Sequence, residues 1–348
     1  MLGGLNSFHY LCRQQTLQTM NIVELDGYAA NPGDLDWQPW REIETEDGNC
    51  CSFTVYDRTP EELVVERAAE ADIIIINKVR ISEEVMAQLP RLRYVGVLAT
   101  GYNVVDIEAA RRRGIVVTNI PAYSTASVAQ LVFAHILNIS NAVAQHSQSV
   151  RSGDWGRCPD FTYTLTPQKE IAGRVMGIIG FGNTGRAVAE IAHAFGMKVV
   201  LAPSLRGAGS VRKDLPEYAE QAETLERFFA TADIVSLHCP LTDTTRHIIN
   251  ATTLSQMKPE AIVINTGRGP LVDEEALAEA LEQHRIMAAG LDVLEEEPPV
   301  NGSPLLTARN CYITPHIAWA TLEARKRLME IAINNVKAFL KGTPVNVV

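Results

Sequence analysis

Residues 175–185 read Val175-Met-Gly-Ile-Ile-Gly-Phe-Gly-Asn-Thr-Gly185. The apolar run over 175–179 is typical of a buried parallel strand, and a G-x-G-x-x-G loop follows it directly. A helix predicted over 186–195 would present its N-terminal N–H groups to a pyrophosphate, and the glycines would let the backbone approach that group. Strand, loop and helix together predict a dinucleotide-binding site that includes Gly180, Phe181 and Gly182.

Strands and helices alternate on both sides of this loop. In the second half of the chain, further strands are predicted at 198–201, 234–237, 261–265 and 288–293, with a helix at 274–284 that Asp273 caps. In the first half, strands are predicted at 21–25, 73–76, 94–98 and 115–118, with helices at 61–70, 83–89 and 104–113. Alternation of this kind implies right-handed crossovers, so the sequence predicts an α/β protein with two doubly wound parallel sheets.

Two longer helices complete this organisation. Pro121 interrupts the first alternating series, and the largely apolar segment 127–150 is predicted to form one long connecting helix. The segment 321–340 is predicted to form an amphipathic helix with a capping Thr at its start and Gly342 after its end. Its position indicates that the chain returns to the first domain.

Length and composition bound the class of protein. A chain of 348 residues suits two domains of about 100 to 200 residues, with a cleft between them. A net charge of −10 argues against nucleic-acid binding, and no apolar run approaches the ~18 to 20 residues that a membrane span needs. The six cysteines form no C-x-x-C pair, so we expect reduced thiols in a cytoplasmic protein and no metal site. Residues 1–19 are expected to be a disordered leader.

The second strand of the dinucleotide unit ends without the usual acid. An NAD-preferring site places a carboxylate about 20 residues past the glycine loop, where it accepts from the ribose 2'-hydroxyl. Here that position is Ser204, and Arg206 and Arg212 follow. A missing carboxylate removes repulsion against a 2'-phosphate, and an arginine could pair with it. The sequence therefore favours NADP over NAD, while a solvated loop that accepts either cofactor stays open.

Three later segments place polar residues just past strands. They bring Arg268, Glu297 and His316 to the carboxyl ends of parallel strands, where ligands bind in open α/β sheets. Reduction of a 2-keto acid needs a cation for the carboxylate and an acid that protonates the developing alkoxide. Arg268 fits the first role, His316 the second, and Glu297 would be the carboxylate that pairs with His316. Glu295 or Glu296 could serve instead of Glu297, and among the eight histidines only His316 combines a turn with a ready acid.

These residues resemble the D-isomer-specific 2-hydroxyacid dehydrogenase family, and within it the hydroxypyruvate reductase or glycerate dehydrogenase branch. The resemblance covers nearly the whole chain from Met20. It rests on an ordered set of motifs: Ala99-Thr-Gly-Tyr-Asn-Val-Val-Asp106, the glycine loop, Leu237-His-Cys-Pro-Leu-Thr242, and the segments with Arg268, Glu297 and His316. The resemblance implies two Rossmann-like domains: a substrate domain at 20–120 plus 319–348, and a dinucleotide-binding domain at 121–318.

The resemblance also assigns further contacts. Asn183 and Thr184 would meet the pyrophosphate, and Asp292 would hold the nicotinamide carboxamide unless it only caps a turn. The backbone at Thr100 and Gly101 would bind the substrate carboxylate together with Arg268. The other implied cofactor contacts are Cys239, Pro240, Thr245, Thr266 and Gly267. A homodimer is implied, with the helix 127–150 at the interface.

The expected function is hydride transfer between NAD(P)H and a small 2-keto or 2-hydroxy acid. Hydroxypyruvate and glyoxylate are the substrates expected first. Two alternatives stay open. One is a nucleotide-sensing, corepressor-like binding protein on the same fold, because fold does not settle function. The other is a dehydrogenase for formate or phosphite. The sequence leaves the substrate side chain, the physiological direction and the dimer geometry undetermined.

Overall fold

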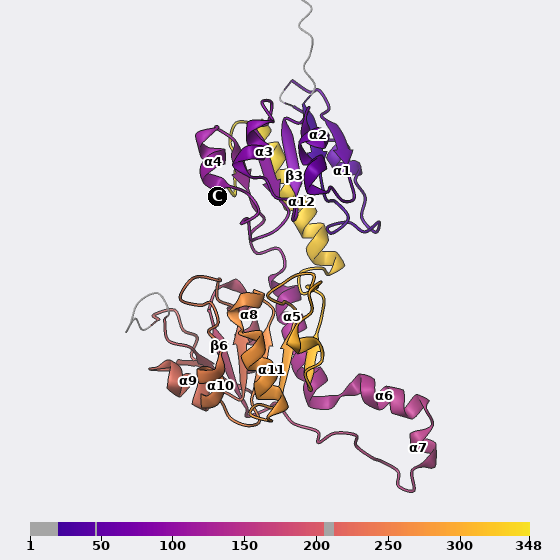
Figure 1. Cartoon of the computed structure of the whole chain (residues 1–348), viewed down its shortest axis with the longest axis vertical. Helices are drawn as coiled ribbons and strands as arrows, with labels where there is room; N and C mark the ends of the chain where they lie inside the picture. Colours follow the sequence, from indigo (N-terminus) through magenta and orange to yellow (C-terminus); the bar gives the residue numbers. More distant parts are fainter. Residues whose placement is uncertain (1–19, 46, 205–211) are drawn as a thin grey trace, which may run out of the picture. The chain divides into compact units, whose positions relative to one another are not determined.

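The computed structural model describes residues 20–45, 47–204 and 212–348, which form two compact units (Figure 1). Unit 1 comprises the chain up to Pro121 together with Lys326–Val348, and unit 2 comprises Ala122–Arg325. Each unit is built around one parallel β-sheet. The predicted α/β class with two doubly wound parallel sheets is therefore confirmed.

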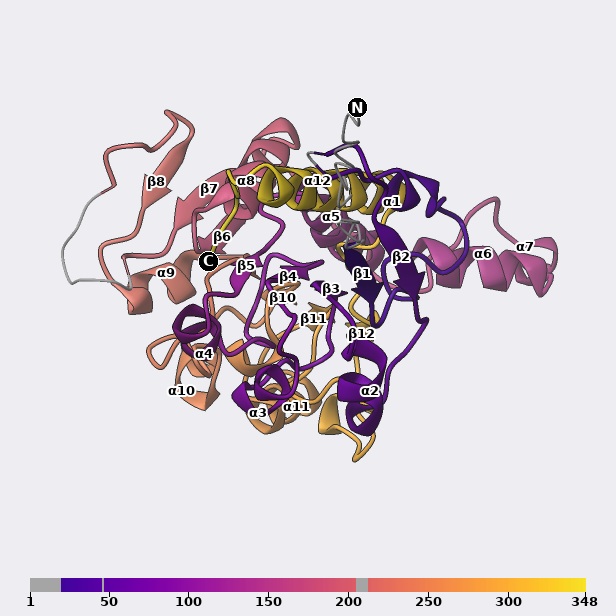
Figure 2. The ribbon, with the colours of Figure 1, turned by 90° about the horizontal axis from the view of Figure 1, so that it is seen from above.

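Unit 1 contains a five-stranded sheet in the order β2-β1-β3-β4-β5. Its strands are β1 (Asn21–Glu24), β2 (Ser52–Val55), β3 (Ile73–Ile76), β4 (Tyr94–Val97) and β5 (Val116–Thr118). Its helices are α1 (Gln38–Arg41), η1 (Glu61–Leu63), α2 (Val64–Ala68), α3 (Glu83–Ala87), α4 (Ile107–Arg112) and, from Lys326 on, α12 (Leu322–Leu340). Figure 2 shows α2, α3 and α4 on one face of this sheet and α12 on the other.

The core of unit 1 explains why its central strand consists of four isoleucines. All four residues of β3 are fully buried, since helices cover both faces of the sheet. On one face Ile74 and Ile76 pack in a cluster with Met86 of α3. On the other face the ring of Tyr94 lies 4.8 Å from that of Phe339 on α12, measured between centroids. The last helix thus completes the core of unit 1.

Unit 2 contains a seven-stranded sheet in the order β12-β11-β10-β9-β6-β7-β8. Its strands are β6 (Val175–Ile179), β7 (Lys198–Leu201), β8 (Ala219–Gln221), β9 (Ile234–Leu237), β10 (Ile262–Asn265), β11 (Ala288–Leu291) and β12 (Cys311–Ile313). Its helices are α5 (Thr125–Asn141), α6 (Val143–Arg151), α7 (Asp154–Arg157), α8 (Asn183–Ala194), α9 (Leu225–Thr231), α10 (Ala251–Gln256), η2 (Gly269–Leu271), α11 (Glu274–Glu282) and η3 (Pro304–Leu306).

Helices cover both faces of this second sheet. On one face Val132 of α5 and Val188 of α8 pack against Ile178 of β6. On the other face Phe228 of α9 and Leu277 of α11 belong to a second cluster. With both faces covered, the central strands consist of buried apolar residues, as the sequence pattern predicts.

The prediction of a single helix over 127–150 is wrong. The structure breaks it at Ala142, whose φ of 47° lies in the left-handed region, and α5 and α6 meet at an angle of 53°. Apolar periodicity alone does not reveal a one-residue break. After the break, α6, α7 and the returning segment 158–170 project from the rest of unit 2 (Figure 1). We call residues 143–170 the arm.

Other differences concern short elements. Strands β2 and β8 and helices α9 and α10 are not predicted from the sequence, because they have three to seven residues and half-exposed patterns or few periodic positions. The predicted helix 186–195 begins three residues earlier, at Asn183, directly after the glycine loop. The predicted cap of 274–284 is confirmed, because the Asp273 side chain accepts from the Ala276 N–H.

The length and composition of the helices bear on whether any of them could span a membrane. Within the described residues no single helix is both long and apolar enough to cross a bilayer. The bent pair α5 and α6 passes that test together, by length and composition only.

Candidate active site

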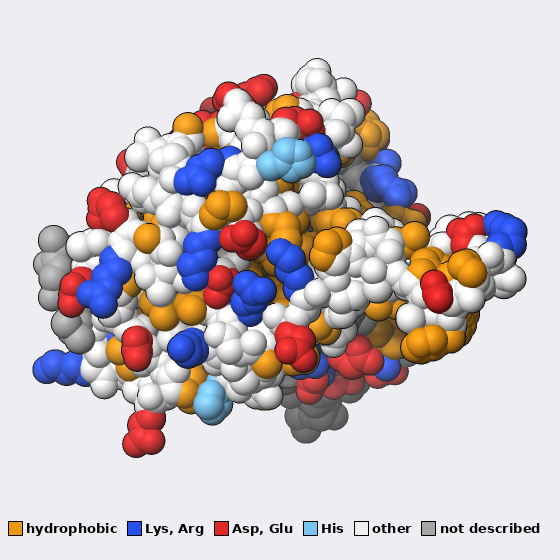
Figure 3. Space-filling model, turned by 90° about the horizontal axis from the view of Figure 1, so that it is seen from below, with side chains coloured by type: hydrophobic (Ala, Val, Ile, Leu, Met, Phe, Trp, Pro, Cys, Tyr) orange, Lys and Arg blue, Asp and Glu red, His pale blue; other side chains and the backbone are white. Residues whose placement is uncertain are grey.

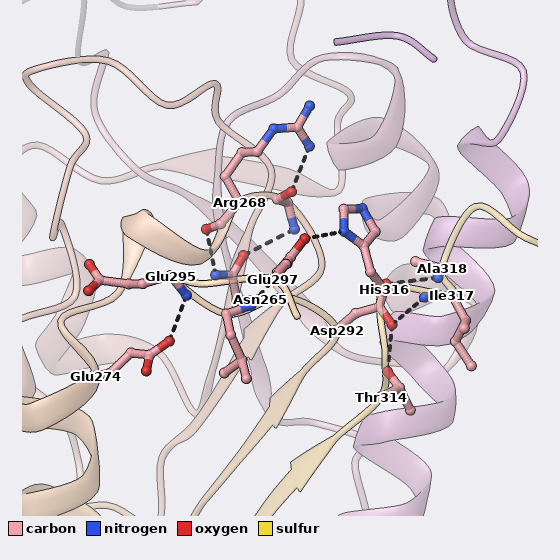
Figure 4. Close-up of polar contacts among 12 residues, drawn as sticks. Asn265, Arg268, Glu274, Asp292, Glu295, Glu297, Thr314, His316, Ile317 and Ala318 are labelled. Carbon is pink, nitrogen blue, oxygen red and sulfur yellow. Dashed lines mark hydrogen bonds and ion pairs between the residues drawn. The ribbon is translucent and has the colours of Figure 1, made fainter. Parts of the chain in front are cut away.

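The three predicted catalytic residues lie on loops that follow three neighbouring strands. Arg268 follows β10, Glu297 follows β11, and His316 follows β12. These strands pair in parallel, β10 with β11 and β11 with β12. Because parallel strands end at the same edge of a sheet, their loops meet there, and Figure 4 shows the side chains of all three residues at this edge.

His316 and Glu297 form a direct pair. His316 Nδ1 lies 2.6 Å from Glu297 Oε2, and the two side chains are 28% and 34% exposed. The other carboxylate oxygen, Oε1, accepts from the backbone N–H of Leu294 at 3.1 Å, which fixes the carboxylate on its loop. His316 has a φ of 53°, and its N–H donates to the carbonyl of Asp292. The backbone of His316 is thus held by Asp292 and its imidazole by Glu297, with Nε2 left toward the open edge (Figure 4).

The neighbouring acids have other partners. Glu295 Oε1 lies 2.5 Å from His247 Nε2, and in Figure 4 its side chain points away from His316. Glu296 accepts from the Asn301 side-chain amide at 2.8 Å. Glu297 is therefore the acid of this run that contacts His316. The expectation that His316 alone combines a turn with a ready acid is wrong, since His247 also lies in a turn and contacts Glu295. His247 and Glu295 are 48 residues apart, so this pair left no local signal in the sequence.

Asn265 builds the loop that carries Arg268. Its side chain is 1% exposed, accepts from the N–H of Gly267 at 3.0 Å and donates to the carbonyl of Arg268 at 2.8 Å. A Cβ at Gly269 would lie 1.8 Å from the Leu294 carbonyl oxygen, so the loop packs directly on the one that leads to Glu297. The Arg268 side chain is exposed, with Nη1 donating to the Gly267 carbonyl at 2.8 Å. Its guanidinium is thus open to a ligand at the same edge of the sheet as His316 (Figure 4).

Asp292 orders the segment that carries His316. It is 1% exposed and accepts from the Thr314 hydroxyl at 2.6 Å and from the N–H groups of Ile317 and Ala318, both at 2.8 Å (Figure 4). Buried carboxylates of this kind are stabilised by several donors. The structure thus shows Asp292 in the turn-capping role that the sequence left open.

His135 joins this network, and sequence reasoning missed it. The side chain lies on α5, 5% exposed, with Nε2 3.3 Å from the Thr314 hydroxyl oxygen. Burial lowers the pKa of His135, and the nearby Asp292 opposes that shift. Gly290 makes room for it, since a Cβ there would lie 2.7 Å from His135 Cβ. Because 179 residues separate His135 from Thr314, the only sequence signal is a polar residue in an apolar helix.

A cavity of about 640 Å³ lies at the glycine loop of unit 2. It is lined by the ends of β6, β7 and β8 and by the loops that follow β6, β7 and β9. Predicted cofactor residues on its walls are Gly180, Phe181, Gly182, Ser204, Cys239, Pro240 and Thr245, together with Arg212. Asn183 and Thr184 start α8 beside it. Arg206 falls outside the described residues.

The glycine loop fits a dinucleotide. Gly180 has a φ of +96°, and a Cβ there would lie 2.4 Å from the Cys239 nitrogen, while a Cβ at Gly185 would lie 2.1 Å from the Gly180 carbonyl oxygen. At Gly182, by contrast, no atom comes within 4 Å of such a Cβ. The backbone is thus bare where a phosphate approaches the start of α8.

A second observation supports a bound group. The hydroxyl of Thr266, which is 8% exposed, has no hydrogen-bond partner among the described residues. A buried polar atom of this kind usually has a partner, and a ligand would supply it. Thr266 and Gly267 lie between the end of β10 and Arg268, so they would hold the nicotinamide end of the cofactor on the loop that carries Arg268. The residues present therefore fit a dinucleotide.

The wall of the cavity that His238 and Cys239 form carries no charge. Burial lowers the pKa of His238 to about 4 and raises the pKa of the Cys239 thiol to about 11, so both are uncharged near neutral pH. The His238 ring hydrogen-bonds the Ser236 hydroxyl at 2.8 Å. Thr245 was predicted as a polar contact; its hydroxyl donates to the Pro240 carbonyl at 2.7 Å and braces that loop.

Unit 1 contains the remaining predicted residues. Thr100 and Gly101 follow β4, and the Thr100 hydroxyl donates to the Ile120 carbonyl at 2.8 Å. The Asn119 side chain donates to the Thr100 carbonyl at the same distance. Within the described part of the chain, no acceptor takes the backbone N–H of Thr100 or Gly101. Two fixed, unpaired amides at a strand end are available to an anion.

Known proteins similar to this chain belong to the family that the site residues resemble. A family model described as "D-isomer specific 2-hydroxyacid dehydrogenase, NAD binding domain" matches residues 133–318. The hydroxypyruvate reductase of Blautia hydrogenotrophica is 46% identical over 332 residues, covering 94% of this chain and 99% of the relative. The glycerate dehydrogenase of Methylorubrum extorquens is 41% identical over 292 residues, 83% of this chain and 89% of the relative.

The chain also resembles a relative whose structure was solved with a bound cofactor. The NADPH-dependent glyoxylate/hydroxypyruvate reductase of Sinorhizobium meliloti, in complex with NADP and malonate, superposes with a TM-score of 0.77. It is 29% identical, and the match covers 94% of this chain and 96% of that one.

Proposed function

Because the chain belongs to the D-isomer-specific 2-hydroxyacid dehydrogenase family, we propose that it reduces a small 2-keto acid, with hydroxypyruvate or glyoxylate the preferred substrate. Relatives named for these substrates support the choice. The observation that carries the proposal is the His316–Glu297 pair beside Arg268, at the edge of a sheet with a dinucleotide cavity.

The side chains divide the chemistry between them. A bound reduced nicotinamide supplies the hydride. Arg268 binds the substrate carboxylate and polarises the keto group through its second donor. His316 donates the proton from Nε2 to the developing alkoxide, and Glu297 on Nδ1 stabilises the protonated ring and fixes its orientation. In unit 1, the amides of Thr100 and Gly101 are proposed to bind the substrate as well.

Initial rates with a panel of 2-keto acids test this function. We expect kcat/KM to be highest for hydroxypyruvate or glyoxylate and lower for pyruvate and phenylpyruvate, with NADH and NADPH each assayed. Formate and phosphite with the oxidised cofactors complete the panel. If the protein binds the cofactors but turns over none of these compounds, the corepressor-like alternative gains and the proposed reaction is wrong.

We further propose that NADPH is the preferred cofactor. Ser204 lines the cavity where an NAD-binding relative would place an acid, and Arg212 lines the same cavity. A charge-assisted hydrogen bond from an arginine to a 2'-phosphate contributes about 1.5 to 3 kcal/mol, or roughly 10- to 150-fold in affinity. The described residues that line the cavity include no carboxylate.

Substituting Ser204 with Asp tests that preference. The added carboxylate repels a 2'-phosphate and accepts from a 2'-hydroxyl, so the ratio of kcat/KM for NADPH to that for NADH should fall by at least about tenfold. Ser255→Asp, which adds the same charge on α10 outside the cavity lining, should leave the ratio unchanged. A parent protein that prefers NADH, with Ser204→Asp making no difference, would refute the preference.

The arm supports the proposal of a homodimer. It exposes a row of apolar side chains, which Figure 3 shows on the projecting segment: Val143, Val150, Trp155, Phe161 and Leu165, between 43% and 87% exposed. Yet the arm is internally ordered, since the Trp155 indole donates to the Phe161 carbonyl and the Ser149 hydroxyl bonds both Asp154 and Tyr163. An ordered, projecting apolar surface is stabilised by a partner, and a second copy supplies one by two-fold symmetry.

Phe161→Asp is expected to convert the dimer to a monomer. Phe161 is 87% exposed, so the change cannot disturb the core, but a carboxylate there would be desolvated in an interface. Light scattering coupled to gel filtration measures the mass. Leu306→Asp, at a 52% exposed residue off the arm, is the control and should leave the mass unchanged. Equal masses for all three proteins would exclude the arm as the interface.

A cytoplasmic location is part of the same proposal. The five described cysteines are all free thiols, as is usual in a reducing compartment.

A further inference from the structure

Two arginines and one aspartate surround Phe181 at the rim of the cofactor cavity. Arg186 on α8 places its guanidinium carbon 4.5 Å from the centre of the Phe181 ring, and Arg212 places its own at 5.4 Å. The ring is 6% exposed and fixed within the glycine loop. Cation–π contacts with the Phe181 ring therefore hold both guanidinium groups beside the glycine loop.

Asp214 bridges these two guanidinium groups. Its Oδ1 accepts from Arg212 Nε at 3.2 Å, and its Oδ2 accepts from Nη2 of Arg212 at 3.4 Å and, in a shorter contact, from Nη2 of Arg186. The hydrogen bond from Arg212 is the main reason why the pKa of Asp214 lies below its ordinary value. The carboxylate is thus ionised at neutral pH and offsets one of the two positive charges.

Of Arg186, Arg212 and Asp214, Arg212 alone lines the cofactor cavity. Arg212 lines the cavity together with Ser204, whereas Arg186 and Asp214 line an adjacent hollow that shares Phe181. Among the residues that the structure describes, Arg212 Nη1 has no hydrogen-bond partner. Arg212 can therefore meet an anion at the end of β7 through Nη1, but its Nε and Nη2 already contact Asp214.

We propose that Asp214 is an internal competitor of the cofactor's 2'-phosphate and so sets how strongly the protein discriminates NADPH from NADH. The carboxylate occupies donors of Arg212 that a phosphate would take, and it lowers the positive potential that attracts the phosphate. Arg212 does not depend on Asp214 for its place, because the Phe181 ring and the Phe181 carbonyl, 3.4 Å from Nη2, also hold it. Removing the charge should therefore strengthen phosphate binding and not weaken it.

This inference rests on the proposed function, and a binding experiment separates the two. The probes are adenosine 2',5'-bisphosphate and adenosine 5'-monophosphate, which differ by the 2'-phosphate alone, and titration calorimetry measures their Kd without turnover. Asp214→Asn should tighten the bisphosphate at least about threefold at low salt, because the surface charge is partly screened, and leave the monophosphate unchanged. The gain should shrink as salt is raised.

Two further variants make the assignment specific. In an Arg212→Ala background, Asp214→Asn should tighten the bisphosphate clearly less than it does in the parent, since Asp214 acts mainly through Arg212. Glu108→Gln removes a surface carboxylate that pairs with Arg111 in unit 1 and controls for net charge; it should leave both Kd values unchanged.

The outcomes are distinct. If the parent binds NADH or NADPH and Asp214→Asn leaves the bisphosphate unchanged or weakens it, the competitor role is overturned while the proposed function stands. If Asp214→Asn tightens both probes equally, the effect is not directed at the 2'-phosphate and the inference is again wrong. If the parent binds neither cofactor, the proposed function fails as well.

Discussion

Replacing His316 with alanine should lower kcat for 2-keto acid reduction by at least about 100-fold, with the Kd of the reduced cofactor within about twofold of the parent. Glu297 orients the imidazole at the loop edge, and the Asp292 carbonyl holds the backbone of His316. Without it, water must donate the proton to the alkoxide. Stopped-flow hydride transfer and cofactor fluorescence titration measure the two quantities separately.

A companion variant tests the partner. Glu297→Gln keeps a hydrogen-bond acceptor near His316 Nδ1 but removes the charge that stabilises the protonated ring. A loss of about tenfold in kcat is expected, smaller than for His316→Ala, because the acid itself remains.

The chain supplies a matched control for this pair. His247 and Glu295 form a second histidine–acid contact in unit 2, at 2.5 Å, on the neighbouring loops. His247→Ala should keep kcat within about twofold of the parent, because the ring has no place in the proposed proton transfer. Near-normal turnover by His316→Ala, or a comparable loss in His247→Ala, would remove His316 from the role of acid.

The convergence of Arg268, Glu297 and His316 could be predicted because it depends on topology. Each follows a short apolar run, and parallel strands bring their carboxyl ends to one edge whatever the lengths of the connections. Glu297 was the predicted acid, but the sequence alone left Glu295 and Glu296 open as alternatives. Glu295, Glu296 and Glu297 are adjacent, and the local backbone decides which of them faces His316.

Features that depend on contacts between distant residues lay beyond the sequence. His135 reads as an interruption of an apolar helix, and its meaning comes from Thr314 on another element. Asp214 reads as a loop residue, and its contact with Arg186, 28 residues earlier, cannot be predicted from the sequence. Likewise the break at Ala142 is a single left-handed residue inside a periodic pattern. Periodicity predicts which residues are buried, but not which polar groups meet.

Exchanging Arg268 for lysine is the second large effect that we expect. Lysine keeps the positive charge, so a site that needs charge alone would tolerate it. A carboxylate and a keto oxygen held together need two donors in one plane, which a guanidinium offers and an ammonium does not. We therefore expect kcat/KM for hydroxypyruvate or glyoxylate to fall by about 100-fold, in line with the about 1.5 to 3 kcal/mol that one hydrogen bond to a charged group contributes.

The division of that loss between kcat and KM shows what Arg268 does. If it only binds the carboxylate, KM rises and kcat is kept; if it also polarises the keto group in the transition state, kcat falls too, and the latter is expected. Arg174→Lys, at an exposed arginine of the same unit whose partner is Asp233, controls for the exchange itself. Added guanidinium should restore part of the activity of Arg268→Ala, where the space is empty, but not of Arg268→Lys, where the ammonium fills it. If Arg268→Lys has the same kcat and KM as the parent, the substrate does not need a planar pair of donors. Asn265 and Gly269 would then hold this loop for another reason.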